Sequence, residues 1–177
     1  MYNVKANDWI QSLANYPAFQ NCIALSDKAL EEQYDIELVT RFFCLKQVSI
    51  DSLNISDLGA FLDETILSLV ADANFDFDLE EANFKKTFDV LANALGDKSF
   101  RRFSVRKDRF GGGFLVSVFE VVAMGLGHHM SDKYQPNVDV ATIPSKIWQD
   151  KGESIGSGLN ASRRLKLTLP LGRSLFE

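Results

Sequence analysis

The chain has 177 residues, of which 46% are hydrophobic and 14 are Phe, and its formal net charge is −5. This length and apolar content predict one folded domain with a hydrophobic core, and they argue against a disordered chain. No apolar run approaches the roughly 18 residues that span a bilayer, and the start MYNVKANDWIQ lacks the features of a secretion signal. We therefore expect a cytoplasmic protein with no membrane partner.

The charge is distributed unevenly along the chain. Residues 1–96 hold 6 Lys or Arg against 16 Asp or Glu, a balance of −10, whereas residues 97–177 hold 13 against 8, a balance of +5. Two explanations fit this split: the acidic and basic halves face each other, or the basic half faces a polyanion.

The first third of the chain predicts short helices. Asn7 is a candidate N-cap, Pro17 suits the first turn of a second helix, and Ser26 caps a third. A further helix is expected over residues 37–46, with Arg41 in its middle. An arginine among apolar neighbours predicts a structural anchor that pairs with a carboxylate or a helix end.

Two longer helices follow. Ser56 begins the first, and its apolar side chains recur at helical spacing as far as Val70. For the second, Asp78 and Glu81 form a candidate capping box, and apolar residues then recur at intervals of three and four up to Gly96. We expect the rest of the chain to pack around this second helix.

The segment 104–113 contains RKDRFGGG and predicts an exposed loop, whereas residues 114–126 are apolar nearly throughout. An all-apolar stretch of this length favours a helix in the middle of a bundle over a β-strand, and Glu120 within it then needs a partner. His128 and His129 follow at the expected C-terminal end of that helix, where cationic side chains are favoured.

The last third predicts a short helix over residues 144–150 and a final helix that Asn160 caps and Pro170 kinks or ends. Strand alternation is scarce, and the dipeptides typical of hairpin turns are absent. The predicted fold is all-α: a single domain, residues 1–177, formed by a compact bundle of about six or seven helices with a central buried helix.

No catalytic signature is present: the chain lacks phosphate-loop, dinucleotide, zinc-protease and nucleophile-elbow motifs. Cys22 and Cys44 are expected to be buried, reduced thiols, and two adjacent histidines are a poor metal pair. We therefore predict no enzyme activity, cofactor or metal. An unfamiliar active site around Glu120, His128 and His129 remains a lesser alternative.

The basic residues after Gly96 keep a binding function in view. The candidate nucleic-acid-binding residues are Lys98, Arg101, Arg102, Arg106, Lys107, Arg109, Arg163 and Arg164. Basic side chains neutralise phosphates, and the interleaved Phe100, Phe103 and Phe110 are of a kind that stacks on unpaired bases. The competing interpretation is that these Phe residues anchor the segment to the core and the arginines pair with the acidic half.

The segments ELVTRFFCLK, LGAFLDETI, FKKTFDVLANALGDKSFRRF, FLVSVFEVVAMGL and GSGLNASRRLK resemble, in this order, the helical C-terminal half of GmrSD-type DNA restriction proteins. In that family a ParB-like or sulfiredoxin-like domain precedes the helical half. Arg41 and Arg101 match recurring arginines of the family. The family's nucleotide-hydrolysing activity is associated with a DGQQR-type motif that does not occur here, so the resemblance transfers no catalytic residue.

The resemblance implies a non-catalytic, accessory helical domain of a DNA-targeting bacterial defence protein, with DNA and a separate N-terminal catalytic half as partners. The alternative is a protein-interaction bundle whose basic half docks an acidic protein and which has no nucleic-acid role.

Overall fold

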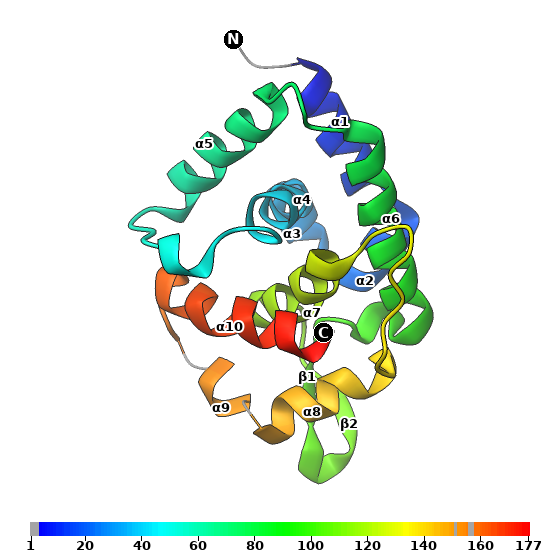
Figure 1. The fold of residues 1–177 in the computed structure, drawn as a ribbon. Helices are drawn as coiled ribbons and strands as arrows, with labels where there is room; N and C mark the ends of the chain where they lie inside the picture. Colours follow the sequence, from blue (N-terminus) through cyan, green and yellow to red (C-terminus); the bar gives the residue numbers. More distant parts are fainter. Residues whose placement is uncertain (1–3, 151, 156–157) are drawn as a thin grey trace.

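The computed structural model of the chain describes residues 4–150, 152–155 and 158–177, which form a mostly helical domain (Figure 1). The helices are α1 (Val4–Ala14), α2 (Pro17–Ile23), α3 (Asp27–Glu31), α4 (Tyr34–Leu45), α5 (Leu58–Ala71), α6 (Phe77–Ala94), α7 (Val116–His129), α8 (Ile143–Asp150), α9 (Gly152–Ile155) and α10 (Ala161–Leu175). The all-α prediction is confirmed. The described part has more helices than the six or seven expected. Left-handed residues, Ala24 (φ 39°) and Gln33 (φ 57°), keep the short helices predicted near the N-terminus separate, and α9 was not predicted.

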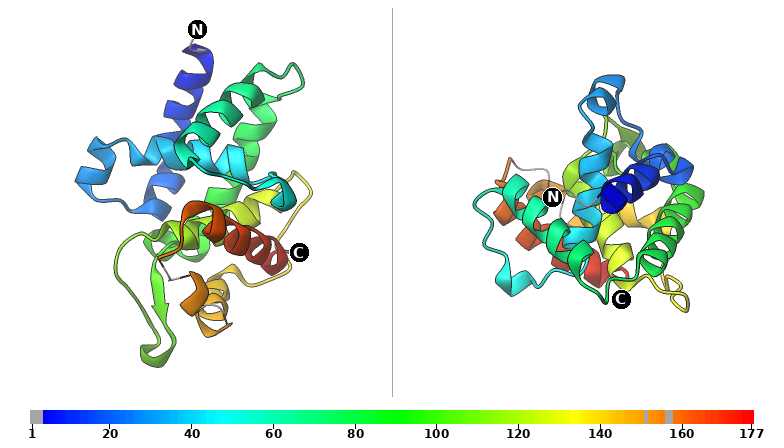
Figure 2. Two further views of the ribbon diagram at one scale, coloured as in Figure 1. Left: turned by 90° about the vertical axis from the view of Figure 1, so that its left-hand side faces the viewer. Right: turned by 90° about the horizontal axis from the view of Figure 1, so that it is seen from above.

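Helix α7 lies in the middle of the fold, as predicted for the apolar segment 114–126 (Figures 1 and 2). Every residue from Ser117 to Gly127 is buried, and α10, α6 and α4 pack against it. A helix that is apolar on all sides is stable only where neighbours cover all of it. This requirement explains why α7, and not α6, is the element around which the chain is arranged.

The backbones of α7 and α10 touch. A Cβ atom on Gly125 would overlap the backbone of Gly172, and a Cβ on Gly172 would overlap the carbonyl of Val121. Both positions therefore require glycine, since any other residue places a side-chain atom where the neighbouring backbone already lies.

Phenylalanine rings fill the space between α2, α4, α6 and α7. Phe88 lies 4.6 Å from Phe84 and 4.8 Å from Phe19, measured between ring centroids, and Phe42 lies 5.2 Å from Phe84. Such tilted and edge-on pairs add to the free energy gained by burying the rings. The apolar face predicted for α6 is therefore its core face.

Two expectations about α6 are wrong. Asp76, not Asp78, is the N-cap, and its carboxylate accepts a hydrogen bond of 3.0 Å from the amide of Leu79. The helix begins earlier than predicted because Phe77 packs against Trp9, with ring centroids 5.1 Å apart. The helix also lies at the side of the domain rather than at its centre (Figure 1).

The other helix starts were predicted with mixed success. Ser26 caps α3 and Asn160 caps α10, as expected. Asn7 lies inside α1, which the structure describes from Val4 onward, and Asp57 rather than Ser56 caps α5.

Pro170 does not end the last helix, which continues to Leu175. Proline removes one backbone donor, and the carbonyl left without it lies one turn earlier, at Lys166. Both Pro170 and Lys166 are exposed, so water can satisfy that carbonyl and the helix proceeds.

The segment predicted as an exposed loop forms a two-stranded antiparallel hairpin. Its strands are β1 (Arg102–Ser104) and β2 (Arg109–Gly111), and a short 3-10 turn (Val105–Lys107) joins them. The strands are too short to show alternation in the sequence. Asp108 (φ 47°) supplies the left-handed residue that turn dipeptides usually provide.

Cys22 and Cys44 are free, buried thiols, as predicted, and burial raises their pKa values to about 11 and about 12. Among the described helices, none is both long enough and apolar enough to cross a membrane.

Candidate nucleic-acid interface

The hairpin has two different faces. Its register pairs Arg102 with Gly111, Phe103 with Phe110, and Ser104 with Arg109. Paired residues share a face and successive residues alternate, so Arg102, Ser104, Arg109 and Gly111 lie on one face. Phe103 and Phe110 lie on the other, with ring centroids 5.0 Å apart.

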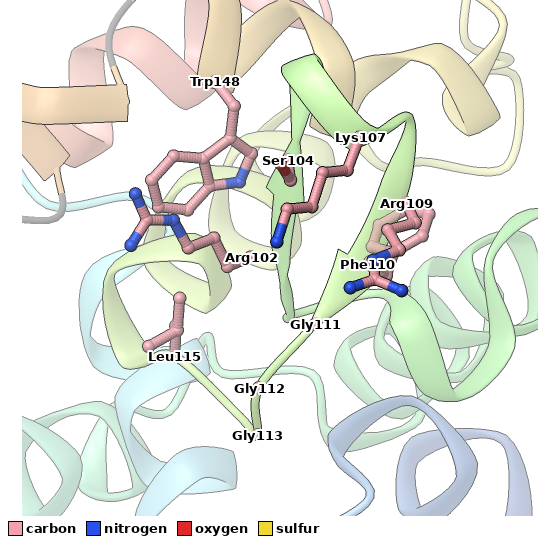
Figure 3. A pocket seen from close by; sticks show the side chains of 10 residues that line it. All are labelled: Arg102, Ser104, Lys107, Arg109, Phe110, Gly111, Gly112, Gly113, Leu115 and Trp148. Carbon is pink, nitrogen blue, oxygen red and sulfur yellow. The ribbon is translucent and has the colours of Figure 1, made fainter.

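A cavity of about 360 Å³ lies between the first of these faces and α8 (Figure 3). We call it the hairpin cavity; Arg102, Lys107 and Arg109 of the hairpin, Gly111–Gly113 and Trp148 of α8 line it. The guanidinium carbon of Arg102 lies 5.2 Å from the centroid of the Trp148 ring, which is a cation–π contact. Among the described residues, the cavity lining contains three cationic side chains and no carboxylate.

Four of the predicted cations form one exposed group, which we call the hairpin cations: Arg102, Arg106, Lys107 and Arg109. In the described part of the chain, none of them forms an ion pair with an acidic side chain. Each exposed cation of this kind is available to an external anion at little desolvation cost.

Two neighbouring cations of the same cluster have partners. Arg101 donates a hydrogen bond of 2.9 Å to Asp97, and the ammonium of Lys98 lies 6.0 Å from the ring centroid of Phe110. Phe100 is fully buried against Phe119, with ring centroids 5.0 Å apart. Phe100 thus anchors the segment to the core, as the competing interpretation of the Phe residues held.

The structure separates the two remaining candidates, which are adjacent in the sequence. Arg163 is exposed in the first turn of α10. Arg164 points inward and donates hydrogen bonds of 2.9–3.1 Å to both carboxylate oxygens of Glu120. Arg164 therefore neutralises a buried charge of its own chain and does not belong to the exposed group.

Glu120 is the centre of a buried charge network. Its side chain is 0% exposed and also binds the hydroxyl of Thr168 at 3.1 Å and Arg41 at 3.5 Å, and Arg41 continues to Glu37 at 2.6 Å. Burial alone lowers the pKa of Arg164, but the hydrogen bonds and charge of Glu120 outweigh it and raise that pKa overall. The predictions that Arg41 anchors on a carboxylate and that Glu120 finds a partner are confirmed.

The ion pairs also bear on the charge asymmetry. In the ranges that the structure describes, no Lys or Arg of residues 97–177 pairs with an Asp or Glu of residues 4–96. The one ion pair between described residues that joins the two halves runs the other way, from Arg41 to Glu120. The described ion pairs therefore do not neutralise the Lys and Arg residues of the basic half with carboxylates of the acidic half.

The two histidines at the C-terminal end of α7 form hydrogen bonds with main-chain carbonyls of other segments. His128 Nδ1 lies 2.8 Å from the carbonyl oxygen of Lys46, and His129 Nε2 lies 2.8 Å from that of Arg173. Glu120 is eight residues from His128, roughly 12 Å along the helix, so the three residues do not converge. The described residues contain no group of three or more His, Cys, Asp or Glu placed to hold a metal ion.

Comparisons with protein families, characterised proteins and solved structures give no match for this chain. The resemblance to GmrSD-type proteins therefore stays a prediction.

Sequence reasoning located the cations but missed the cavity. It treated residues 111–113 as the end of an exposed loop and Trp148 as part of a short helix over residues 144–150. Three consecutive glycines beside basic residues are the local signal that was available. Nothing in the sequence indicates that Trp148 lies against Arg102, because the two are 46 positions apart and only the fold brings them together.

Proposed function

We propose that this chain is a non-catalytic helical domain that contacts nucleic acid through the hairpin cations. The observation that carries the proposal is that four exposed cations on one short hairpin have no acidic partner in the described structure. Phosphates are the anions that such a cluster neutralises in nucleic-acid-binding proteins, and the release of counterions drives that association.

The position of the hairpin supports this function. It projects from the helical body (Figure 2), so the hairpin cations can reach a large polyanion without rearrangement of the core. The helical body supplies a rigid support, because Phe100, directly before the hairpin, is fully buried.

The GmrSD-like resemblance supplies the wider context of the proposal. In that context the domain serves as an accessory part of a DNA-targeting defence protein, and a separate partner carries the catalytic half. The hairpin would then hold DNA while the partner acts on it.

Fluorescence anisotropy with labelled single-stranded and duplex DNA at two salt concentrations tests the proposal. The variant Arg106→Gln/Lys107→Gln/Arg109→Gln removes three hairpin cations and keeps Arg102, which packs on Trp148. For single strands, three lost phosphate contacts reduce the slope of log affinity against log salt by about 2.

The matched control is Lys5→Gln/Lys28→Gln/Lys133→Gln, which changes the net charge equally at exposed positions outside the hairpin. Wild type and control should bind alike, and the hairpin variant should bind more weakly. Equal binding by all three proteins, or no binding by wild type at low salt, contradicts the proposal. In the latter case, binding of an acidic protein to the same cations would favour the protein-interaction alternative.

A further inference from the structure

The hairpin cavity is built differently from a simple phosphate-binding surface. Arg102 places its planar guanidinium group in the cavity wall, with the central carbon 5.2 Å from the centroid of the Trp148 ring. Trp148 in turn packs closely against Gly152, where a Cβ atom would lie only 2.5 Å from the indole ring. Planar guanidinium groups and indole rings are the surfaces on which unpaired bases stack.

The glycines keep the cavity open. A Cβ atom placed on Gly111, Gly112 or Gly113 would meet no other atom within 4 Å. These three residues thus form a wall of main chain with free space beside it. A cavity of about 360 Å³ is at the small end of the range for ligand sites, roughly 300–1,000 Å³, and admits one base rather than a duplex.

One buried donor in the cavity wall lacks a partner. The indole Nε1 of Trp148 is buried and forms no hydrogen bond within the described structure. Figure 3 shows it on the edge of the ring that faces Ser104 of β1. An unsatisfied buried N–H costs free energy, and this atom, which has no exposed surface, is closed to a ligand in the cavity as the indole ring stands.

The geometry points to a site for one unpaired nucleobase in the hairpin cavity, with the flanking phosphates on Lys107 and Arg109. This inference rests on the proposed function and narrows it to single-stranded nucleic acid. In an intact duplex the bases remain stacked inside the helix, so no base can enter the cavity. In a single strand one base leaves the stack, enters the cavity and packs against the plane of Arg102.

The test compares two labelled single strands of equal length and charge by fluorescence anisotropy: oligo-dT, and the same backbone with abasic residues throughout. Stacking of one base corresponds to roughly a 5- to 150-fold difference in affinity. We expect wild type to bind oligo-dT more tightly by a factor in this range.

A cavity-filling variant makes the test specific. Residue 111 shares the hairpin face of Arg102, so Gly111→Leu places a side chain on the cavity side and leaves every charge in place. Its matched control is Gly158→Leu, where a Cβ also meets open space but lies outside the cavity. Gly111→Leu should abolish the preference for oligo-dT and keep the affinity for the abasic strand, whereas Gly158→Leu should preserve both.

Equal binding of the two strands by wild type overturns the base site and leaves phosphate contact by the hairpin intact. A preference for oligo-dT that survives Gly111→Leu also overturns the base site, since the base then stacks elsewhere. Failure of wild type to bind either strand at low salt overturns the proposed function together with this inference.

Discussion

In the contact between α7 and α10, Arg164 binds Glu120 through several hydrogen bonds, and the backbones of Gly125 and Gly172 touch. In the hairpin, cations of the same chemical type have no acidic partner among the described residues, and the glycines border open space. Arginine and glycine thus serve packing in one region and leave room for a ligand in the other.

This difference teaches that residue type alone does not identify a binding site. Adjacent Arg163 and Arg164 look equivalent in the sequence, but the helix turns one outward and the other toward a buried carboxylate. The distinguishing property is whether the protein itself already supplies the partner. Substitutions in the two regions should accordingly affect different quantities: stability in the first, and binding in the second.

The largest loss of unfolding free energy is expected for Glu120→Gln. Removing this carboxylate leaves the inward-facing guanidinium of Arg164 without a counter-charge, and breaking a buried pair of this kind costs about 3–5 kcal/mol of unfolding free energy. Urea denaturation followed by circular dichroism measures the loss.

The matched control for this prediction is Glu37→Gln, which removes the half-exposed end of the same network. That pair is partly solvated, so the control should lose about 1 kcal/mol or less. Equal losses in the two variants would show that the buried position of Glu120 is not what makes it important.

The second largest loss of unfolding free energy is expected for Gly172→Ala. Alanine normally stabilises an exposed helix position relative to glycine by about 1 kcal/mol. Here the added methyl group overlaps the carbonyl of Val121, so the two helices must move apart, at a cost of about 1–3 kcal/mol. The same denaturation measurement decides the sign, and a more stable variant would contradict the close contact.

Patterns of apolar spacing predicted most of the helices, since burial of one face imposes a period that the sequence records. The caps at Ser26 and Asn160 were also predictable, because a capping side chain bonds to a backbone amide only three residues further along the chain. The contact of Gly125 with Gly172, and that of Arg102 with Trp148, join distant parts of the chain, and neither leaves a local pattern. The hairpin was missed because three-residue strands are too short to show a period of two.

A smaller change in stability, which depends on pH, is expected from His128 at the end of α7. Burial lowers the pKa of His128, and the hydrogen bond to the Lys46 carbonyl opposes this shift. The nearby groups Arg173, His129 and Lys46 lower the pKa further. A histidine with a depressed folded-state pKa contributes stability at pH values above its unfolded-state pKa of about 6.5. That stability is lost as the pH falls through the folded-state pKa.

Wild type should therefore be less stable at pH 5 than at pH 7. The variant His128→Gln should show a smaller difference between these two pH values in urea denaturation, and an unchanged difference would assign the pH dependence to other groups.

The smallest effect on stability is expected for the variant that should most weaken binding. In Arg106→Gln/Lys107→Gln/Arg109→Gln the exchanged side chains are exposed and have no ion-pair partner in the described structure, so the unfolding free energy should change by less than about 0.5 kcal/mol. If the variant loses DNA affinity at unchanged stability, the hairpin cations act on an external ligand. If instead it is destabilised by more than 1 kcal/mol, within the range of a lost intramolecular hydrogen bond, these cations hold the hairpin against the body of the protein and the contrast with the α7–α10 contact fails.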